Sequence, residues 1–396
     1  MNPPASAPGS PRRLAVVISH PTQYYSPWFR QIAAVPNLEL RVFYLWDFGV
    51  ADRIDRQFGR SIRWDTDLLS GYAHEFIPNL SRNPGTHHFR GLHNPALGSR
   101  LRAFAPDAIL VFGYAYRTHL SLFLRRPAPL IFRGDSHLLG RPRPSWPRRV
   151  LLSRLFARCA AVTYTGLANR DYFRALGVPE ARLHFAPHCV DAARFARTPL
   201  VERDAAALRQ QLDLGDRRVV LFAGKFLPAK QPLGLLEAFI ALAPRDAALV
   251  FVGDGEQRAE LEARAAAHPG CIVRFMPFAN QSEMPARYAL AELFVLPSRG
   301  LYETWGLAVN EAMHLGVPCL VSDRVGCQRD LVSDGETGWV FPAAQPGALA
   351  TALGRALREL PVDAAGRRLR VIARVSQYTY PQATAGLLRA LAAACR

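Results

Sequence analysis

Two lysines stand close together in a chain that otherwise uses arginine as its cation. Of the 49 Lys and Arg residues, only Lys225 and Lys230 are lysines, and both lie in the run KFLPAK, directly after the apolar run RVVLFA. Lysine offers a compact ammonium that rotates freely, and a loop between a strand and a helix is where α/β proteins bind anions. The pair is therefore predicted to neutralise a diphosphate. A chance grouping in a solvated loop is the alternative.

A second reactive group lies in the run SRGLYETWGLAVNEAMHL. Glu303 precedes a predicted helix that begins near Gly306, and Glu311 lies inside this helix. A carboxylate accepts two hydrogen bonds at once, so Glu303 is suited to the hydroxyls of a sugar and Glu311 to those of a ribose. The backbone N–H groups of Gly306, Leu307 and Ala308 would bind phosphate or sugar oxygens. The alternative is that Glu303 only caps the helix and Glu311 lies on the surface.

Polar residues also follow predicted strands elsewhere. In the turn VGDGE, Gly253 is expected to face a ligand, although an ordinary tight turn would look the same. In the first half of the chain, the loop SHPTQYYSP carries groups suited to the hydroxyls of an acceptor, and FRGDSH carries an acid and a histidine suited to a reacting centre. These candidates are His20, Gln23 and Tyr24 in the first loop, and Arg133, Asp135 and His137 in the second. A structural Arg–Asp pair and a surface histidine are the alternative for FRGDSH.

Short apolar runs alternate with helical patterns along the chain, which predicts an α/β protein with two doubly wound, Rossmann-like domains and a ligand cleft between them. The predicted boundaries are a disordered tail over residues 1–12, a first domain over 13–200, a second domain over 201–380, and a last helix over 381–396 that could pack back on the first domain. The stretch 47–94 is predicted as long loops, and the linker is placed around 186–216.

The charge is uneven. The net charge is +17, and residues 1–200 hold 27 arginines against 12 acidic residues, whereas the remainder is almost balanced. An anionic membrane surface, a phosphorylated acceptor or nucleic acid would suit such a basic half, and a solvated arginine-rich surface is the alternative. The six cysteines form no C-x-x-C pair, so neither a zinc site nor a disulfide framework is expected. His87 and His88 lack a third ligand, so no metal is predicted. No apolar stretch is long enough to span a membrane, and a cytoplasmic location is expected.

The runs GKFLPAK, VGDGE and LPSRGLYETWGLAVNEAMHLGVPCLVSD, in this order and spacing, resemble the C-terminal half of the retaining nucleotide-sugar glycosyltransferases of family 4, which have the GT-B fold. The resemblance is strong from about residue 218 to 394. It implies that Lys230 binds the donor diphosphate, that Glu303 faces the donor sugar and that Glu311 holds the ribose. Lys225 stands where the family usually has Arg, and Asp330 where it often has Glu.

The resemblance also implies an activity. The first domain would bind a glycan or lipid-linked acceptor, and the second a nucleotide-diphosphate sugar, which is the donor substrate; no metal or other cofactor is expected. Sugar transfer with retention, in cell-surface polysaccharide biosynthesis and at the inner face of the membrane, would follow. Nucleic acid is not an expected partner. A nucleotide-sugar epimerase of the same fold, a basic nucleic-acid-binding protein and a non-catalytic sugar-nucleotide-binding protein remain as alternatives.

Overall fold

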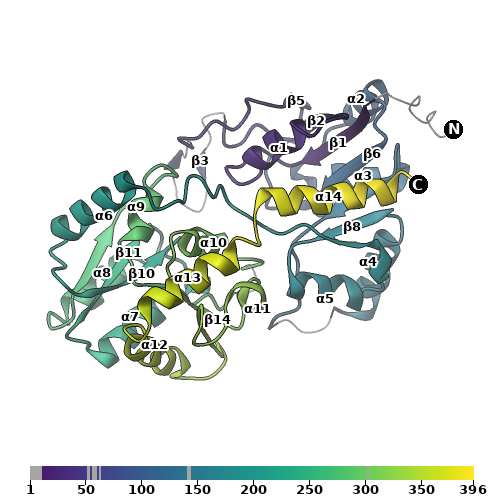
Figure 1. Ribbon diagram of the computed structural model, residues 1–396. Coiled ribbons are helices and arrows are strands. Elements are labelled where there is room, and N and C mark those ends of the chain that lie inside the picture. The colour runs from purple at the N-terminus through teal and green to yellow at the C-terminus, as the bar shows by residue number, and fades with distance from the viewer. Residues whose placement is uncertain (1–10, 51–53, 56–59, 62–63, 141–143, 301–302) are drawn as a thin grey trace.

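The computed structural model describes residues 11–50, 54–55, 60–61, 64–140, 144–300 and 303–396. Two separate parallel sheets form the two halves of the molecule (Figure 1). Both are flanked by helices on their two faces, so the predicted fold class is confirmed. The predicted tail over residues 1–12 lies almost wholly outside the described residues, and Arg12 already begins a strand.

The first sheet has seven strands, and all of its neighbouring strands run parallel. In spatial order they are β5 (Ala73–Phe76), β2 (Leu38–Tyr44), β1 (Arg12–Ile18), β6 (Ala108–Phe112), β7 (Leu130–Arg133), β8 (Ala161–Tyr164) and β9 (Leu183–Phe185). A short antiparallel pair, β3 (Ile54–Asp55) and β4 (Arg60–Ser61), lies apart from this sheet. The central strands are apolar throughout because helices cover both faces.

The helices of the first domain fall into two layers. One layer packs in the core around Val17, Ile109 and Phe132, and the other in the core around Val16, Leu110 and Ile131. The side chains of neighbouring strand residues thus pack against opposite helix layers, because successive side chains of a strand point to opposite faces of the sheet. The first layer comprises α2 (Leu97–Phe104), α3 (Arg117–Arg125), α4 (Trp146–Phe156) and α5 (Leu167–Ala175), and the second comprises α1 (Ser26–Ala33) and α14 (Tyr380–Ala394).

The second sheet has six parallel strands. In spatial order they are β12 (Val273–Met276), β11 (Ala247–Val252), β10 (Arg218–Ala223), β13 (Leu293–Leu296), β14 (Cys319–Ser322) and β15 (Gly338–Phe341). One face is covered by α6 (Pro199–Gln211), α9 (Met284–Ala289), α10 (Leu307–His314), α11 (Gln328–Leu331) and α13 (Ala364–Val375). The other is covered by α7 (Pro232–Leu242), α8 (Arg258–Ala266) and α12 (Ala348–Glu359).

Three short 3-10 helices complete the described elements: η1 (Phe89–Gly91), η2 (Glu180–Arg182) and η3 (Pro228–Lys230). Two stretches differ from the prediction. The stretch 47–94 contains β5, an edge strand too short and too polar to be recognised, and the linker region 186–216 contains α6. The side chain of Thr198 caps α6 by accepting from the N–H of Val201, and Pro199 follows at the first turn, so a start signal for this helix was present in the sequence.

The last helix, α14, leaves the second domain and lies on the first (Figure 1). It packs on β8 and β9, and the indole N–H of Trp28 in α1 donates to the hydroxyl of Thr384 at 3.0 Å. At Gly386 the helix approaches the sheet so closely that an added Cβ would overlap the carbonyl oxygen of Phe185. This contact joins the end of the chain to the first sheet.

The close approach at Gly386 gives a test of this packing. Gly386→Ala should lower the free energy of unfolding by about 1–3 kcal/mol, because the new methyl group must push α14 away from β9. Gly98→Ala is the matched control: it also lies in a helix, but its Cβ would meet only the ends of arginine side chains at 3.6 Å or more. Alanine there should be neutral or stabilising by up to about 1 kcal/mol. Equal effects in denaturant titrations would show that α14 is not tightly packed on the sheet.

Candidate functional site

The loops at the carboxyl ends of the strands of both domains meet at the border between the domains, which is called the cleft below. From the second domain these are the loops that follow β10, β11 and β13, and from the first domain those that follow β1 and β7. Contacts between the two domains here include those of Tyr24 with Glu311, Asp135 with Thr304, and His137 with Glu303. The sequence candidates of the two halves are thus brought together.

The lysine loop is held by backbone contacts to the neighbouring turn. The N–H of Gly224 donates to Val252 at 3.0 Å, and the N–H of Phe226 donates to Asp254 at 2.8 Å. A side chain at Gly253 would overlap the carbonyl oxygen of Gly224, so only glycine fits where the two loops touch. Gly253 therefore fixes the loop that carries Lys225. Its predicted contact with a ligand stays a prediction.

Lys230 and Glu303 form an ion pair across two loops of the second domain. The hydroxyl of Ser298 donates a second hydrogen bond to Glu303 Oε2 at 2.7 Å. The backbone holds the same loop, since the carbonyl oxygen of Glu303 accepts from the N–H of Gly326 at 3.1 Å. The carboxylate of Glu303 is consequently oriented toward the lysine loop, which places the proposed diphosphate ligand and the proposed sugar ligand side by side.

The helix α10 begins behind this pair. Gly306 precedes it with φ of +98°, and an added Cβ would lie 2.9 Å from a methyl carbon of Val325, so glycine is required both by the backbone and by the space. No side chain of the described residues caps the helix. The N–H groups of Leu307 and Ala308 in its first turn have no carbonyl partner within the helix, as in any helix, and they carry its positive end. This end is suited to phosphate oxygens.

Glu311 is buried inside α10 and is not a surface residue. The hydroxyl of Tyr288 donates to its Oε2 at 2.7 Å, and the hydroxyl of Tyr24 donates to its Oε1 at 3.2 Å from the other domain. Burial raises the pKa of Glu311 to about 7, although both tyrosine bonds act in the opposite direction. A ligand can reach this carboxylate only if Tyr24 moves. Tyr288 was not predicted, because nothing in its local sequence distinguishes it from other core tyrosines.

On the first-domain side, Asp135 is the exposed charge of the cleft. Its side chain is 43% exposed, and its Oδ2 accepts from the hydroxyl of Thr304 at 2.7 Å and lies 3.6 Å from His188 Nε2. The protein around it removes water and so opposes ionisation, but the bonds from His188 and Thr304 outweigh this cost and lower the pKa of Asp135 to about 2. Asp135 is therefore a carboxylate at neutral pH. His188 was missed in the sequence, since it follows a short strand with no further signal.

The other two candidates of this loop are buried and structural in this conformation. His137 accepts from the N–H of Leu139 at Nδ1, at 3.1 Å, so its Nε2 carries the proton and faces the carbonyl oxygen of Glu303 at 3.2 Å. Arg133 donates to the carbonyl oxygen of Ala186 at 2.8 Å and lies over the ring of Trp28. In this conformation His137 positions the Glu303 loop and Arg133 supports the segment that leads to His188. Their predicted roles toward an acceptor stay predictions.

The loop after β1 holds its candidate residues His20, Gln23 and Tyr24 in largely buried positions. The ring of His20 packs edge-on against Phe48, with 5.3 Å between ring centroids, and burial lowers the pKa of His20 to about 4. It is neutral at physiological pH, with Nδ1 at 2.9 Å from Ser19 Oγ. Gln23 is buried beside the hydroxyl of Tyr24. Of this loop, Tyr24 is the residue that contacts the second domain through its side chain.

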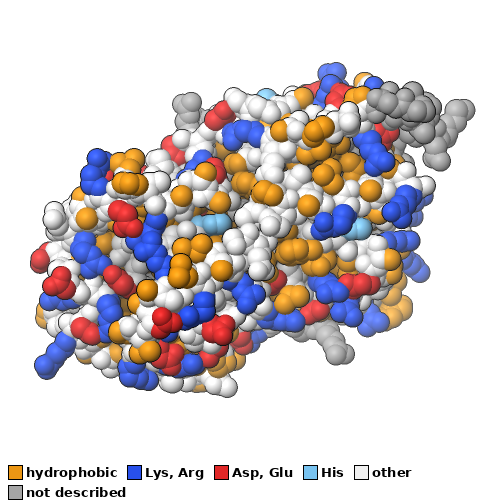
Figure 2. All heavy atoms as spheres, in the orientation of Figure 1, with side chains coloured by type: hydrophobic (Ala, Val, Ile, Leu, Met, Phe, Trp, Pro, Cys, Tyr) orange, Lys and Arg blue, Asp and Glu red, His pale blue; other side chains and the backbone are white. Residues whose placement is uncertain are grey.

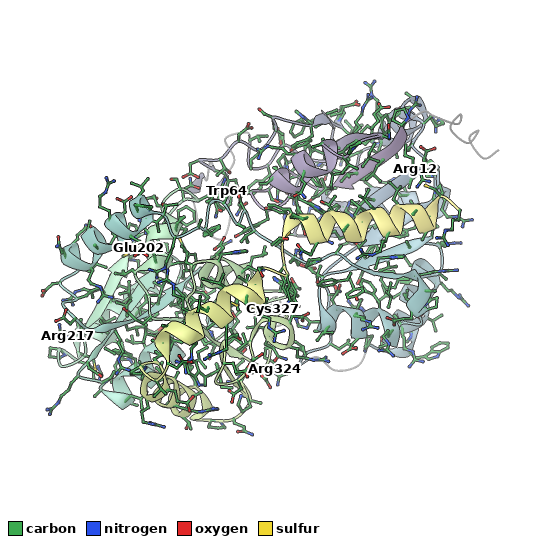
Figure 3. The ribbon with its side chains drawn as sticks, viewed as in Figure 1. Arg12, Trp64, Glu202, Arg217, Arg324 and Cys327 are labelled. Atoms are coloured by element: carbon green, nitrogen blue, oxygen red, sulfur yellow. The ribbon has the colours of Figure 1, made fainter. Side chains whose placement is uncertain are left out.

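Asp330 connects the two domains. Both of its carboxylate oxygens lie within 3.1 Å of the N–H of Leu167, the first residue of α5, so a side chain of the second domain caps a helix of the first. Tyr378 donates to it as well, at 3.1 Å. Burial raises the pKa of Asp330 to about 6. The backbone N–H of Asp330 donates to the carbonyl oxygen of Cys327 at 3.0 Å, and the label of Cys327 in Figure 3 shows where this part of the second domain lies.

No group of three or more His, Cys, Asp or Glu side chains among the described residues could hold a metal ion. Within the same part of the chain, no helix is long and apolar enough to cross a membrane. The histidine pair His87 and His88 lies in the loop before η1, where the two rings pack against each other.

Comparison with known proteins agrees with this geometry. Residues 204–366 match the family described as glycosyl transferases group 1. Among solved structures, that of Anabaena Alr3699/HepE in complex with UDP superposes with a TM-score of 0.70 at 18% identity, over 96% of this chain and 99% of that one. Starch synthase IV from Arabidopsis thaliana superposes with a TM-score of 0.71 at 14% identity, over 98% and 100% of the two chains. Residues 204–366 of the second domain are thus similar to the group 1 glycosyltransferases, and the whole chain has the GT-B fold.

Curated relatives are similar over part of their length. A GDP-mannose-dependent alpha-(1-6)-phosphatidylinositol monomannoside mannosyltransferase of Mycolicibacterium smegmatis is 34% identical over 53% of this chain and 56% of its own. An alpha-D-kanosaminyltransferase of Streptomyces kanamyceticus is 29% identical over 67% of each chain. A D-inositol 3-phosphate glycosyltransferase of Salinispora tropica is 36% identical over 45% of this chain and 38% of its own. The chain therefore spans from about a third to two thirds of these relatives.

The buried carboxyl of Glu311 predicts a pH dependence of stability. The unfolded chain releases this proton near pH 4.5 and the folded protein near pH 7, so the free energy of unfolding falls as the pH rises through this window. The contribution of Glu311 is on the order of 3 kcal/mol. Glu311→Gln, which stays neutral, should lose this part of the decline in urea titrations between pH 5 and pH 8. Contributions of Asp330 and other groups are common to both proteins. Parallel curves for the two proteins would contradict the burial of an ionisable Glu311.

Proposed function

We propose that this protein is a retaining glycosyltransferase, which moves a sugar from a nucleotide-diphosphate donor to a hydroxyl of a glycan or lipid-linked acceptor. The observation that carries the proposal is the arrangement of Lys230, Glu303 and the start of α10 around one point of the cleft. A cation and a helix N-terminus there suit a diphosphate, and a carboxylate beside them suits the hydroxyls of the attached sugar.

The charges of the site match those of the reaction. The bond between the anomeric carbon and the phosphate oxygen breaks, which leaves negative charge on the diphosphate and positive character on the sugar. Lys225, Lys230 and the N–H groups at the start of α10 would stabilise the diphosphate, since fixed charges in a site that excludes water act strongly. The lysines supply this positive charge themselves, so the proposal includes no metal and no cofactor beside the donor substrate.

Donor binding would change the partners of two glutamates. In the present conformation Lys230 neutralises Glu303, and Tyr24 covers Glu311. A diphosphate at Lys230 would draw the ammonium away and leave the carboxylate of Glu303 to the donor sugar. A ribose at Glu311 would take the place of Tyr24, so that the first domain would sense whether the donor is bound. The group 1 match supports a nucleotide-sugar donor for the second domain.

The acceptor would enter from the first-domain side, where Asp135 is ionised at neutral pH. In the retaining reaction that we propose, as in family 4, the acceptor oxygen bonds to the anomeric carbon on the face that the phosphate leaves, and the acceptor proton passes to the leaving phosphate. Asp135 would bind acceptor hydroxyls or stabilise positive charge on the sugar. A role in cell-surface polysaccharide or glycolipid biosynthesis fits the names of the mycobacterial relatives. We also propose that the protein acts at an anionic membrane surface.

The experiment is calorimetric titration with UDP, GDP, ADP and TDP, followed by transfer assays with the sugars of the nucleotide that binds. Lys230→Ala should weaken binding of that nucleotide by about 10- to 100-fold, because one charge-assisted hydrogen bond is lost. The matched control is Arg245→Ala, which removes the same charge from the exposed end of the sheet where β11 begins. It should leave binding unchanged. Unchanged binding by Lys230→Ala would exclude this lysine from the donor site.

A further inference from the structure

The helix α4 carries large apolar side chains on two opposite sides. Leu152, Leu155 and Phe156 are buried in the core of the first domain. On the outer side, Trp146 is 75% exposed and Leu151 is 63% exposed. Large apolar groups on the outer side of a surface helix are costly in water and are typical of a surface that binds another apolar phase.

The neighbouring helix α3 repeats this feature. It packs in the same helix layer as α4, and the two connect consecutive strands of the sheet, β6 to β7 and β7 to β8. Its Leu124 is 67% exposed, whereas Leu122 and Phe123 are buried. The outer surfaces of the two helices therefore present a tryptophan and two leucines on one side of the first domain.

Around these apolar groups the charge is of one sign. Between residues 108 and 160 the only acidic side chain is Asp135, which faces the cleft. The exposed arginines of the two helices and their ends are Arg117, Arg125, Arg126, Arg148, Arg149, Arg154 and Arg158. None of these seven makes an ion pair with any residue that the structure describes. In the second domain, by contrast, the exposed Arg355 bonds to both Asp334 and Glu359, and Arg370 bonds to Asp363. In Figure 2, arginine side chains, drawn in blue, gather along the right-hand edge of the first domain, where Figure 1 places α3 and α4.

We propose that this α3–α4 face, defined by Leu124, Trp146, Leu151 and the seven arginines, binds the surface of an anionic lipid bilayer. Tryptophan and leucine would enter the boundary between headgroups and acyl chains, and the arginines would contact lipid phosphates while their stems lie along the apolar zone. Nucleic acid would use the arginines but offers nothing to two exposed leucines. Charge of one sign and apolar groups on the same face favour the bilayer.

The position of this face connects it with the site. The segment between β7 and α4 carries Asp135 and His137 at its beginning and reaches Trp146 at its end. Helices that follow parallel strands begin at the carboxyl edge of the sheet, so Trp146 lies at the cleft end of α4. A protein that rests on the bilayer with this face would hold the opening of its cleft near lipid headgroups. The idea that the acceptor is lipid-linked rests on the proposed function. Binding of the α3–α4 face to a bilayer does not depend on sugar transfer.

The test is cosedimentation of the full chain with phosphatidylglycerol-rich vesicles and with pure phosphatidylcholine vesicles. The protein should bind the first, release them as salt rises, and bind the second weakly. The triple variant Arg148→Ala/Arg149→Ala/Arg154→Ala should bind on the order of 100-fold more weakly. Trp146→Ser/Leu151→Ser should also lose binding. The matched control is Leu369→Ser on α13, which removes a leucine that is 69% exposed on the second domain and should change nothing.

Three results would overturn the inference: equal binding to both kinds of vesicle, equal losses in Leu369→Ser and the α4 variants, or binding to random oligonucleotides without binding to vesicles. Thermal unfolding shows whether each variant is folded. Nucleoside diphosphate binding separates this inference from the proposed function, because the α4 variants should keep it and Lys230→Ala should lose it while it still binds vesicles.

Discussion

The short segment from Glu303 to Trp305 is held from both domains, and the geometry of the cleft depends on it. Within the second domain, Lys230 and Ser298 hold the carboxylate of Glu303. From the first domain, His137 faces the carbonyl oxygen of Glu303 and Asp135 accepts from Thr304. A change in the spacing of the domains would strain these contacts first. The residue next to the proposed sugar position is thereby linked to the domain that would hold the acceptor.

The carboxyl groups of the cleft differ because their surroundings differ. Burial raises the pKa of Glu311 and Asp330 by more than their hydrogen bonds and the nearby arginines lower it, whereas the contacts with His188 and Thr304 lower that of Asp135 despite its burial. Glu311 and Asp330 both contact the first domain, through Tyr24 and through Leu167. Burial at the contacts between the domains therefore favours the protonated forms of these two carboxyls.

The sequence was sufficient for the fold because buried parallel strands are continuous apolar runs, and the run RVVLFA, for example, is found as β10 (Arg218–Ala223). The sequence was insufficient where an element forms only through a partner that is distant in the chain. The strand β5 is short and polar, and it is stabilised by pairing with β2. The donor side was visible as motifs within one domain. The functions of Tyr288, His188 and Asp330 were not, because each depends on a contact with residues that are far away in the chain.

The most direct test of the account is a crystal structure of the protein grown with the nucleoside diphosphate that it binds. The account predicts the diphosphate at Lys230 and at the N–H groups of Leu307 and Ala308, the ribose hydroxyls at Glu311, and the hydroxyl of Tyr24 displaced from that carboxylate. A diphosphate bound away from Lys230 and the start of α10, or a nucleotide that leaves the bond between Tyr24 and Glu311 intact, would contradict it.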